Sequence, residues 1–268
     1  MLESVEKEKV LEAYTGFASV YDEFMDDIDY EAWCDYLIRL LYEYNIKDGI
    51  IAELGCGTGN ATQILAQNGY DVIGIDLSRE MLGVATDKLY RDSPGESASS
   101  KQQGSVIYVC QDICNLQLPY KVNGMVSICD SMNYIVDYND FLRVLKNVKK
   151  YLNPGGVFIF DLKTRKYFSD IGESVIAEDR EQCSFIWDNF FDAGSNVNEY
   201  RLSLFVQEED GKYRKFVEEH YQRAYLLKEI KEAARESELV IEAIYDAFTK
   251  ESISEESDRI YIILKNNE

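Results

Sequence analysis

The chain has 268 residues, enough for one substantial hydrophobic core or for one core with a small appendage. Acidic residues outnumber basic ones by 49 to 28, giving a net charge of -21, which argues against unaided binding to nucleic acid or to an anionic membrane. The six cysteines include no C-x-x-C pair, so neither a disulfide nor a metal site is expected. Without a run of about 18 apolar residues or a signal-like N-terminus, the expected location is cytoplasmic.

The N-terminal part predicts a short helix over 4–16 and an aromatic-rich segment over 14–25, which includes Tyr14 and Tyr21. This segment fits two interpretations about equally: filler of the hydrophobic core, or a flap that closes over a ligand. From Tyr30 the apolar residues recur at helical spacing, so a helix that packs on a sheet is expected there.

A strand over 50–54 runs into the turn Gly55-Cys56-Gly57-Thr58-Gly59, and a helix follows over 60–67. Glycine tolerates positive φ and has no Cβ, so its backbone can bend sharply and lie against a ligand. A strand, a glycine-rich turn and a helix N-terminus are together typical of a nucleotide-type site at the carboxyl edge of a parallel sheet.

The next strand, over 71–76, ends in Asp76, roughly 20 residues beyond the glycine turn. An acidic side chain at this point can accept hydrogen bonds from both ribose hydroxyls. The alternative role for Asp76 is a helix cap, but Ser78 is the better cap for the helix that follows. We therefore favour a ligand role for Asp76.

Residues 91–104 are poor in apolar side chains and are expected to form a surface loop. A third strand over 106–110 leads to Asp112-Ile113, which could face an adenine, although Asp112 also fits an ordinary loop residue. A fourth strand, over 125–129, is continuously apolar, as is typical of buried parallel strands. The polar side chains that follow it are candidates for holding a substrate: Asp130, Asn133 and Tyr134.

An amphipathic helix over 137–152 ends at an Asn-Pro-Gly-Gly stop signal, and a fifth strand follows over 157–162. The pattern then changes to long alternating segments separated by hairpin-type turns, which predicts a three-stranded antiparallel meander. Its strands are expected over 183–191, 200–207 and 213–225. A helix over 226–236 and strands over 240–245 and 259–264 complete the chain. The last connection is too short for a helical crossover, so these two strands should pair antiparallel.

These motifs together resemble class I S-adenosylmethionine-dependent methyltransferases. The segment Glu53–Gly59 is similar to the family's first motif, and Asp76, Asp112-Ile113, Cys129-Asp130 and Leu152–Gly156 match later motifs in order and spacing. The resemblance implies an α/β, Rossmann-like seven-stranded sheet of strand order 3-2-1-4-5-7-6 flanked by helices, with strand 7 antiparallel and S-adenosylmethionine as cofactor. It implies cofactor contacts for Tyr21, Glu53, Gly55, Cys56, Gly57, Gly59, Asp76, Leu77, Met81, Asp112, Ile113, Cys129 and Asp130. The runner-up is an NAD-dependent oxidoreductase, but its G-x-G-x-x-G fingerprint would need a glycine where Asn60 stands.

The layout resembles more narrowly the glycine N-methyltransferase-like and aminosugar N-methyltransferase-like enzymes and an uncharacterised bacterial methyltransferase group. The likeness rests on Tyr21-Asp22, on the small antiparallel insert after strand 5 and on the segment His220–Tyr225 that ends it. In such enzymes the insert covers the active site and N-terminal tyrosines close over the donor. The implied division is a cofactor-binding domain over 1–170 and 226–268, with a lid or substrate subdomain over 171–225.

Methyl transfer from a sulfonium is an in-line displacement, so proximity and alignment can supply on the order of 7–11 kcal/mol of the acceleration. A neutral amine needs no strong base in that step, whereas a hydroxyl usually needs a base or a metal. The sole histidine, His220, fits a structural role better than a catalytic one, and it is the best candidate base if the acceptor is a hydroxyl. This favours transfer to the nitrogen of a small molecule.

A cationic amine would suit the acidic and aromatic side chains near the site, which are Asp130, Tyr21, Tyr134 and Trp187. The catalytic candidates are accordingly His220, Tyr21, Asn133 and Tyr134. No nucleic-acid or membrane partner is expected, and either a monomer or a dimer is compatible with the sequence. Two other classes stay open: a protein that binds S-adenosylmethionine without turnover, and a partner-docking module that uses the acidic insert.

Overall fold

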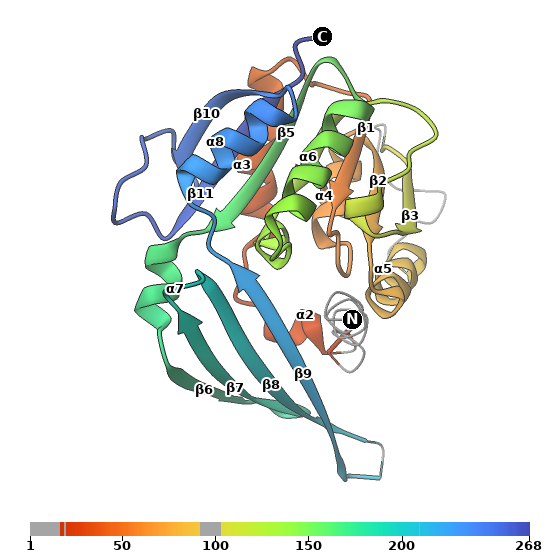
Figure 1. Cartoon of the computed structure of the whole chain (residues 1–268). Helices are drawn as coiled ribbons and strands as arrows, with labels where there is room; N and C mark the ends of the chain where they lie inside the picture. Colours follow the sequence, from red (N-terminus) through yellow and green to blue (C-terminus); the bar gives the residue numbers. More distant parts are fainter. Residues whose placement is uncertain (1–16, 19, 92–102, 209) are drawn as a thin grey trace.

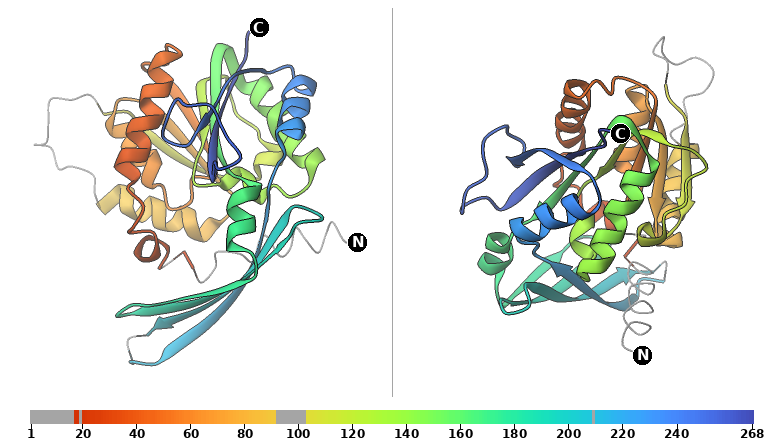
Figure 2. Two further views of the ribbon diagram at one scale, coloured as in Figure 1. Left: turned by 90° about the vertical axis from the view of Figure 1, so that its left-hand side faces the viewer. Right: turned by 45° about the horizontal axis from the view of Figure 1, so that its top comes forward.

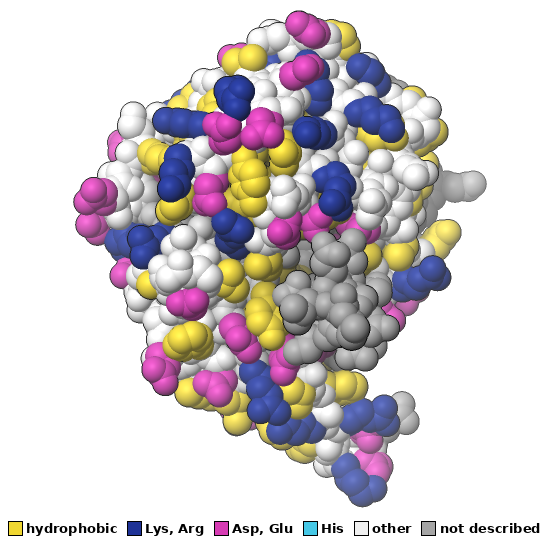
Figure 3. All heavy atoms as spheres, viewed as in Figure 1, with side chains coloured by type: hydrophobic (Ala, Val, Ile, Leu, Met, Phe, Trp, Pro, Cys, Tyr) yellow, Lys and Arg dark blue, Asp and Glu magenta, His cyan; other side chains and the backbone are white. Residues whose placement is uncertain are grey.

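Two separate β-sheets organise the chain in the computed structural model, which describes residues 17–18, 20–91, 103–208 and 210–268 (Figure 1). The helix expected over 4–16, together with Tyr14, and most of the loop expected over 91–104 lie outside the described residues. Within the described residues, no helix is long and apolar enough to cross a membrane. Figure 3 shows acidic and basic side chains intermingled over one face of the molecule.

The larger sheet has seven strands in the order β3-β2-β1-β4-β5-β11-β10. Its strands are β1 (Ile50–Leu54), β2 (Asp71–Asp76), β3 (Val106–Cys110), β4 (Val122–Ser127), β5 (Leu152–Lys163), β10 (Val240–Asp246) and β11 (Arg259–Lys265). The first five pair in parallel, and β11 runs antiparallel to both β5 and β10. The predicted Rossmann-like order, with its antiparallel strand, is confirmed.

Helices cover both faces of this sheet because its central strands are apolar on both sides. On one face α6 (Tyr138–Tyr151) and α8 (Leu227–Glu236) pack on the sheet, and on the other lie α3 (Tyr30–Glu43) and α4 (Asn60–Gln67). A further helix, α5 (Arg79–Arg91), follows β2 (Figures 1 and 2).

The fourth strand ends earlier than the sequence suggests. It was expected to run through Cys129, but β4 stops at Ser127. Cys129 and Asp130 have φ of 57° and 54°, a left-handed conformation that cannot continue a strand. Such a conformation is uncommon for residues other than glycine and is often found at functional sites. The chain therefore turns sharply at the carboxyl edge, directly beside the glycine turn.

The second sheet is antiparallel and has four strands, one more than the predicted meander. They are β6 (Ser174–Asp179), β7 (Cys183–Asp192), β8 (Val197–Gln207) and β9 (Tyr213–Arg223), which follow the helix α7 (Arg165–Ile171). Strand β6 was missed because Val175, Ile176 and Ala177 are all exposed, so this edge strand lacks the alternation of a half-buried strand. The small antiparallel insert expected after strand 5 is confirmed.

The insert sheet lies across the carboxyl edge of the main sheet, with the short helix α2 (Tyr21–Phe24) between the two (Figures 1 and 2). Its inner side packs through a small cluster around Tyr200, Leu202 and Leu204, against which Phe17 and Phe24 lie. The two sheets and the N-terminal segment thus enclose one region at the end of β1, β2 and β4.

Candidate active site

The turn after β1 is bent by three glycines. Gly55, Gly57 and Gly59 have φ of +77°, +53° and +78°, conformations that L side chains rarely adopt. The amides of Gly55 and Cys56 both donate to the carbonyl of Ile75, at 2.8 and 3.0 Å, which holds the turn against the end of β2. A Cβ added at Gly57 would meet no atom within 4 Å, so this part of the turn borders open space.

That open space is a cavity of about 460 Å³ between the two sheets. All the predicted cofactor residues except Gly59 line it: Tyr21, Glu53, Gly55, Cys56, Gly57, Asp76, Leu77, Met81, Asp112, Ile113, Cys129 and Asp130. Gly59 instead occupies the N-cap of α4, where its left-handed φ starts the helix. Residues that lie up to 109 positions apart in the sequence are therefore gathered around one cavity by the sheet topology.

Asp76 lies at the end of β2 with its carboxylate in the cavity wall. Its Oδ2 accepts a hydrogen bond from the Gly57 amide at 2.8 Å, and its Oδ1 accepts one from the Ser78 amide at 2.9 Å. Burial outweighs these bonds and raises the pKa of Asp76. Ser78 Oγ accepts from the Met81 amide at 3.2 Å, as expected of the cap of α5. Each carboxylate oxygen of Asp76 keeps a further lone pair for a ligand hydroxyl.

Glu53, on β1, is almost completely buried beneath the glycine turn and also borders the cavity. Its carboxylate accepts a hydrogen bond from the Thr62 hydroxyl. Burial, together with the neighbouring charge of Asp76, raises the pKa of Glu53 to about 8. A buried carboxyl group that is partly protonated at neutral pH is poised to ionise when a cation arrives beside it.

Asp112 and Ile113 follow β3 at the same edge. Asp112 caps the short helix Ile113–Asn115: its Oδ1 accepts from the Cys114 amide at 2.8 Å, and its Oδ2 from Asn115 Nδ2 at 2.8 Å. The loop role and the adenine-facing role considered for Asp112 are therefore compatible, since the capped carboxylate still lines the cavity.

The floor of the cavity is a buried ion network around Asp130. Lys163 Nζ lies 3.2 Å from Asp130 Oδ2, and Arg259 Nη2 lies 3.0 Å from Asp130 Oδ1. Gln222 Nε2 donates to Asp130 Oδ2 at 2.6 Å, and Arg259 also pairs with the fully buried Asp161. Burial opposes ionisation of Asp130, but the two cations outweigh it and lower its pKa. The floor therefore holds two carboxylates and two cations in mutual contact.

The N-terminal segment closes the cavity from one side. Tyr21 lines the cavity, and burial raises its pKa well above the usual value. The amide of Phe17 donates to Glu218 Oε1 on β9 at 3.2 Å, and the rings of Phe24 and Phe185 meet edge to face at 4.8 Å. Its aromatic rings pack on the insert while they border the cavity, an arrangement compatible with both interpretations of this segment.

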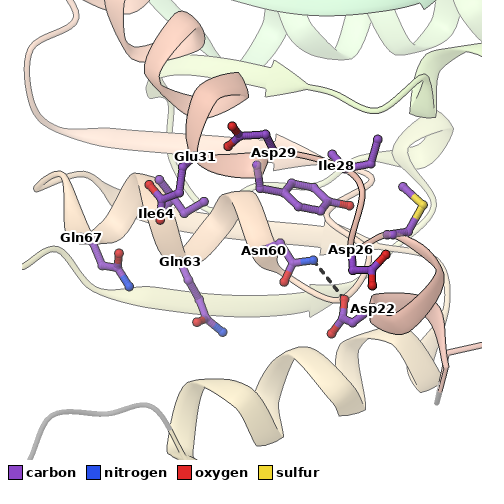
Figure 4. A pocket seen from close by; sticks show the side chains of 11 residues that line it. Asp22, Asp26, Ile28, Asp29, Glu31, Asn60, Gln63, Ile64 and Gln67 are labelled. Atoms are coloured by element: carbon purple, nitrogen blue, oxygen red, sulfur yellow. Dashed lines mark hydrogen bonds between the residues drawn. The ribbon is translucent and has the colours of Figure 1, made fainter. Parts of the chain in front are cut away.

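Beside the cavity lies an open groove of about 490 Å³ whose wall carries Asp26, Asp29 and Glu31 (Figure 4). Asp22 stands at its edge: its Oδ1 accepts from Thr58 Oγ1 at 2.7 Å and from Asn60 Nδ2 at 3.0 Å, the latter drawn in Figure 4. Its Oδ2 lies 2.8 Å from Lys88 Nζ. Asp22 thus ties α2 to the glycine turn and to α5.

The insert contributes the wall opposite the glycine turn. Phe185, Trp187, Tyr200 and Leu202 reach the cavity from β7 and β8, and the hydroxyls of Tyr200 and Tyr134 are 2.5 Å apart. Trp187, which also fits a core position by its sequence pattern, therefore borders the cavity.

Two of the four catalytic candidates lie elsewhere. His220 is buried beside Tyr200, its neighbour on the adjacent strand, whose ring stacks on the imidazole at 4.6 Å, and its Nε2 lies 3.2 Å from Glu218 Oε2. Asn133 is fully buried and uses its amide to join the ends of β5 and β9: it donates to the carbonyls of Lys163 and Arg223 and accepts from the Lys163 amide. Tyr21 and Tyr134 line the cavity.

The sequence reading missed many residues that line the cavity, among them Trp33, Lys163, Tyr167 and Arg259. Lys163 ends the parallel strand β5, so the rule that pointed to Asp76 applies to it equally. Arg259 begins an antiparallel strand, which places its first residue, not its last, at the carboxyl edge. Trp33 carries the helical spacing of a core residue, and its ring lies 4.9 Å from the Arg259 guanidinium.

Fold and cavity together define a Rossmann-like protein with a site for a nucleoside-bearing cofactor at the carboxyl edge of its sheet. The observed groups fit S-adenosylmethionine: open space over Gly57 for close approach, a carboxylate at Asp76 for ribose hydroxyls, and a buried carboxyl at Glu53 beside which a cationic amino group is favourable.

Comparison with known proteins identifies the family. A family described as "Methyltransferase domain" matches residues 52–160. The putative methyltransferase YqeM of Bacillus subtilis is 30% identical over 250 residues, which cover 92% of this chain and 95% of that protein. The solved structure of an S-adenosylmethionine-dependent methyltransferase from Clostridium acetobutylicum superposes with a TM-score of 0.80 at 30% identity, covering 94% of this chain and 98% of that one.

The sugar N-methyltransferase KedS8 from Streptoalloteichus has a TM-score of 0.71 at 17% identity and covers 92% of this chain and 93% of its own, a likeness that shows the shared fold alone. The chain belongs to the class I S-adenosylmethionine-dependent methyltransferases, in the bacterial group that includes YqeM. It is therefore an enzyme with S-adenosylmethionine as its methyl donor, and the dehydrogenase alternative is set aside.

Proposed function

We propose that this methyltransferase transfers the methyl group to the nitrogen of a small molecule. The proposal rests on the protonation states of the groups that line the cavity on the side where the acceptor would bind. Among the described residues that line the cavity opposite the glycine turn, the candidates for a general base are Tyr134 and Tyr200. Burial raises the pKa of Tyr200 well above its usual value. Phenols held neutral do not deprotonate a hydroxyl, whereas a neutral amine attacks without losing a proton first.

Asp130 is not a suitable general base either, because its ion pairs with Lys163 and Arg259 keep it a carboxylate of low basicity. His220 does not line the cavity and stacks beside Tyr200, which does. Positioning then supplies the catalysis: the donor is already activated, and alignment of the two reactants is worth on the order of 7–11 kcal/mol. The fold shared with a sugar N-methyltransferase also supports the proposal.

In this proposal the sequence-predicted cofactor residues hold the donor. Asp76 would accept from the ribose hydroxyls, Asp112 and Ile113 would border the adenine, and Glu53 with the glycine turn would face the methionine part. Tyr21 and Tyr134 would contact the reacting groups, and residues 171–225 would form the substrate subdomain. The six free cysteines support a reducing, cytoplasmic setting.

The test is to incubate the enzyme with methyl-labelled S-adenosylmethionine and pooled metabolites, and to locate the label in the product by NMR. We expect an N-methyl product. With that acceptor, His220→Gln should change kcat by less than about tenfold, since loss of a general base costs about 100- to 10,000-fold. An O-methyl product, or a loss of the latter size with the donor affinity unchanged, would refute nitrogen transfer without a base. No turnover with tight donor binding would instead favour a non-catalytic binding protein.

A further inference from the structure

Opposite the donor-side residues, the cavity is bounded by an aromatic wall, which we define as Phe17, Phe24, Phe185, Trp187, Tyr200 and Leu202. Two of these side chains come from the N-terminal segment and four from β7 and β8 of the insert. Trp187 and Tyr200 contact each other with ring centroids 4.4 Å apart, and Phe24 closes on Phe185 at 4.8 Å. The wall thus joins two segments far apart in the sequence into one apolar surface.

The charged side chains that line the cavity come from other elements than this wall. Among the described lining residues they fall into two groups: the donor side, with Glu53, Asp76 and Asp112, and the floor, with Asp130, Lys163 and Arg259. The floor carboxylate is already in contact with both floor cations. A cationic acceptor would therefore lie near a paired carboxylate and close to the positive sulfonium of the donor, an arrangement that Coulomb repulsion disfavours.

We propose that the acceptor carries its reactive nitrogen on an apolar, ring-sized body that packs on the aromatic wall. This inference rests on nitrogen transfer as proposed above and names the class of amine. The wall offers dispersion and hydrophobic contact, and its polar edge, the Tyr134–Tyr200 hydroxyl pair, offers oxygens that can accept an N–H. The cationic-amine reading of the sequence gives way to this one because Asp130 is paired.

The size of the cavity limits that body. Pockets for drug-sized ligands measure about 300–1,000 Å³, and the donor is itself of drug size. A cavity of about 460 Å³ therefore leaves room for little more than one ring beside the donor. A larger acceptor would have to reach in with one end.

The experiment measures binding of probe amines to the full-length protein saturated with S-adenosylhomocysteine, by calorimetry. Aniline, whose nitrogen is uncharged at neutral pH, and benzyl alcohol should bind at least about tenfold more tightly than glycine, D-glucosamine or tetramethylammonium. Trp187→Ala should weaken the binding of aniline by at least about tenfold. Ile186→Ala is the matched control, because Ile186 precedes Trp187 on β7 and is exposed on the opposite face.

Retained affinity for S-adenosylhomocysteine reports that each variant is folded. If Trp187→Ala no longer binds S-adenosylhomocysteine, Phe185→Leu is tested in its place. Polar amines that bind as tightly as aniline would overturn the inference, and so would tetramethylammonium binding more tightly than benzyl alcohol, or an unchanged aniline affinity in Trp187→Ala. Failure of nitrogen transfer would show separately, as a methyl group on oxygen or carbon of the product.

Discussion

Glu53→Gln should stabilise the ligand-free protein at alkaline pH and weaken its binding of S-adenosylmethionine. Glu53 is 2% exposed, and its carboxylate accepts a hydrogen bond from Thr62. Burial and the nearby Asp76 raise its pKa to about 8 from an unperturbed 4.5. Glutamine keeps the size and an acceptor oxygen for Thr62 but carries no charge that folding must bury.

The sign follows from proton binding in the two states. Because the folded pKa lies above the unfolded one, the stabilisation from Glu53 is fully present below about pH 4.5 and is lost as the pH rises through about 8. At about 1.4 kcal/mol for each pH unit between the two values, the loss reaches about 5 kcal/mol. Glutamine does not titrate, so the variant escapes this loss.

Urea unfolding of the ligand-free proteins at pH 5 and pH 8.5 measures the effect. The two proteins should differ little at pH 5, and the variant should be more stable by several kcal/mol at pH 8.5. Other titrating groups are common to both proteins and cancel in the difference, and Glu242→Gln, exposed on β10, serves as control. Parallel pH profiles for wild type and Glu53→Gln would refute the raised pKa. Calorimetry should show weaker donor binding by the variant, since the buried carboxylate is lost.

Four further perturbations separate donor binding from folding. Asp76→Ala should weaken S-adenosylmethionine binding by at least about tenfold in calorimetry, whereas Asp71→Ala at the exposed start of the same strand should not; equal affinities would refute the ribose role. Gly57→Ala should leave the fold intact, at a cost of about 1 kcal/mol for its left-handed φ, and yet abolish donor binding, because its Cβ points into open space. Gly104→Ala should do the reverse and lower the melting temperature, since its Cβ would lie 1.9 Å from a backbone oxygen. Asp130→Asn should cost about 3–5 kcal/mol in urea unfolding, because Lys163 loses its carboxylate partner and Arg259 keeps only Asp161; a loss below 1 kcal/mol would contradict that reading.

The grouping of the predicted cofactor residues around one cavity was predictable from the sequence, because these residues are local to strand ends. Gly57 and Asp76 are 19 residues apart and meet through one hydrogen bond between adjacent strands. Alternation and apolar runs give the strands, and the order of the parallel strands then brings their carboxyl ends together. The left-handed Cys129 was not predictable in this way, since no local pattern marks a non-glycine residue for positive φ.

The acceptor half escaped prediction because it depends on contacts between distant segments. Arg259 is 129 residues from Asp130, and their pairing follows only once β11 is known to run antiparallel beside β5. His220 illustrates the converse: its residue type made it a candidate base, but it does not line the cavity and instead stacks beside Tyr200, its neighbour on the adjacent strand. A residue type alone does not say which of two side chains on the same face of a sheet borders the cavity.

This difference in origin has a chemical consequence. In the proposed arrangement the donor contacts would come from the glycine turn and from strand ends of one sheet, so they would be in place before any acceptor arrives. The aromatic wall lies largely on a separate sheet, which meets the edge of the first through Gln222 on Asp130 and through Asn133 on Arg223. We therefore expect substitutions on the inner faces of β7 and β8 to alter which amine fits while the geometry at Gly57 and Asp76 stays unchanged, so that in this proposal the choice of acceptor is a property of the insert rather than of the cofactor fold.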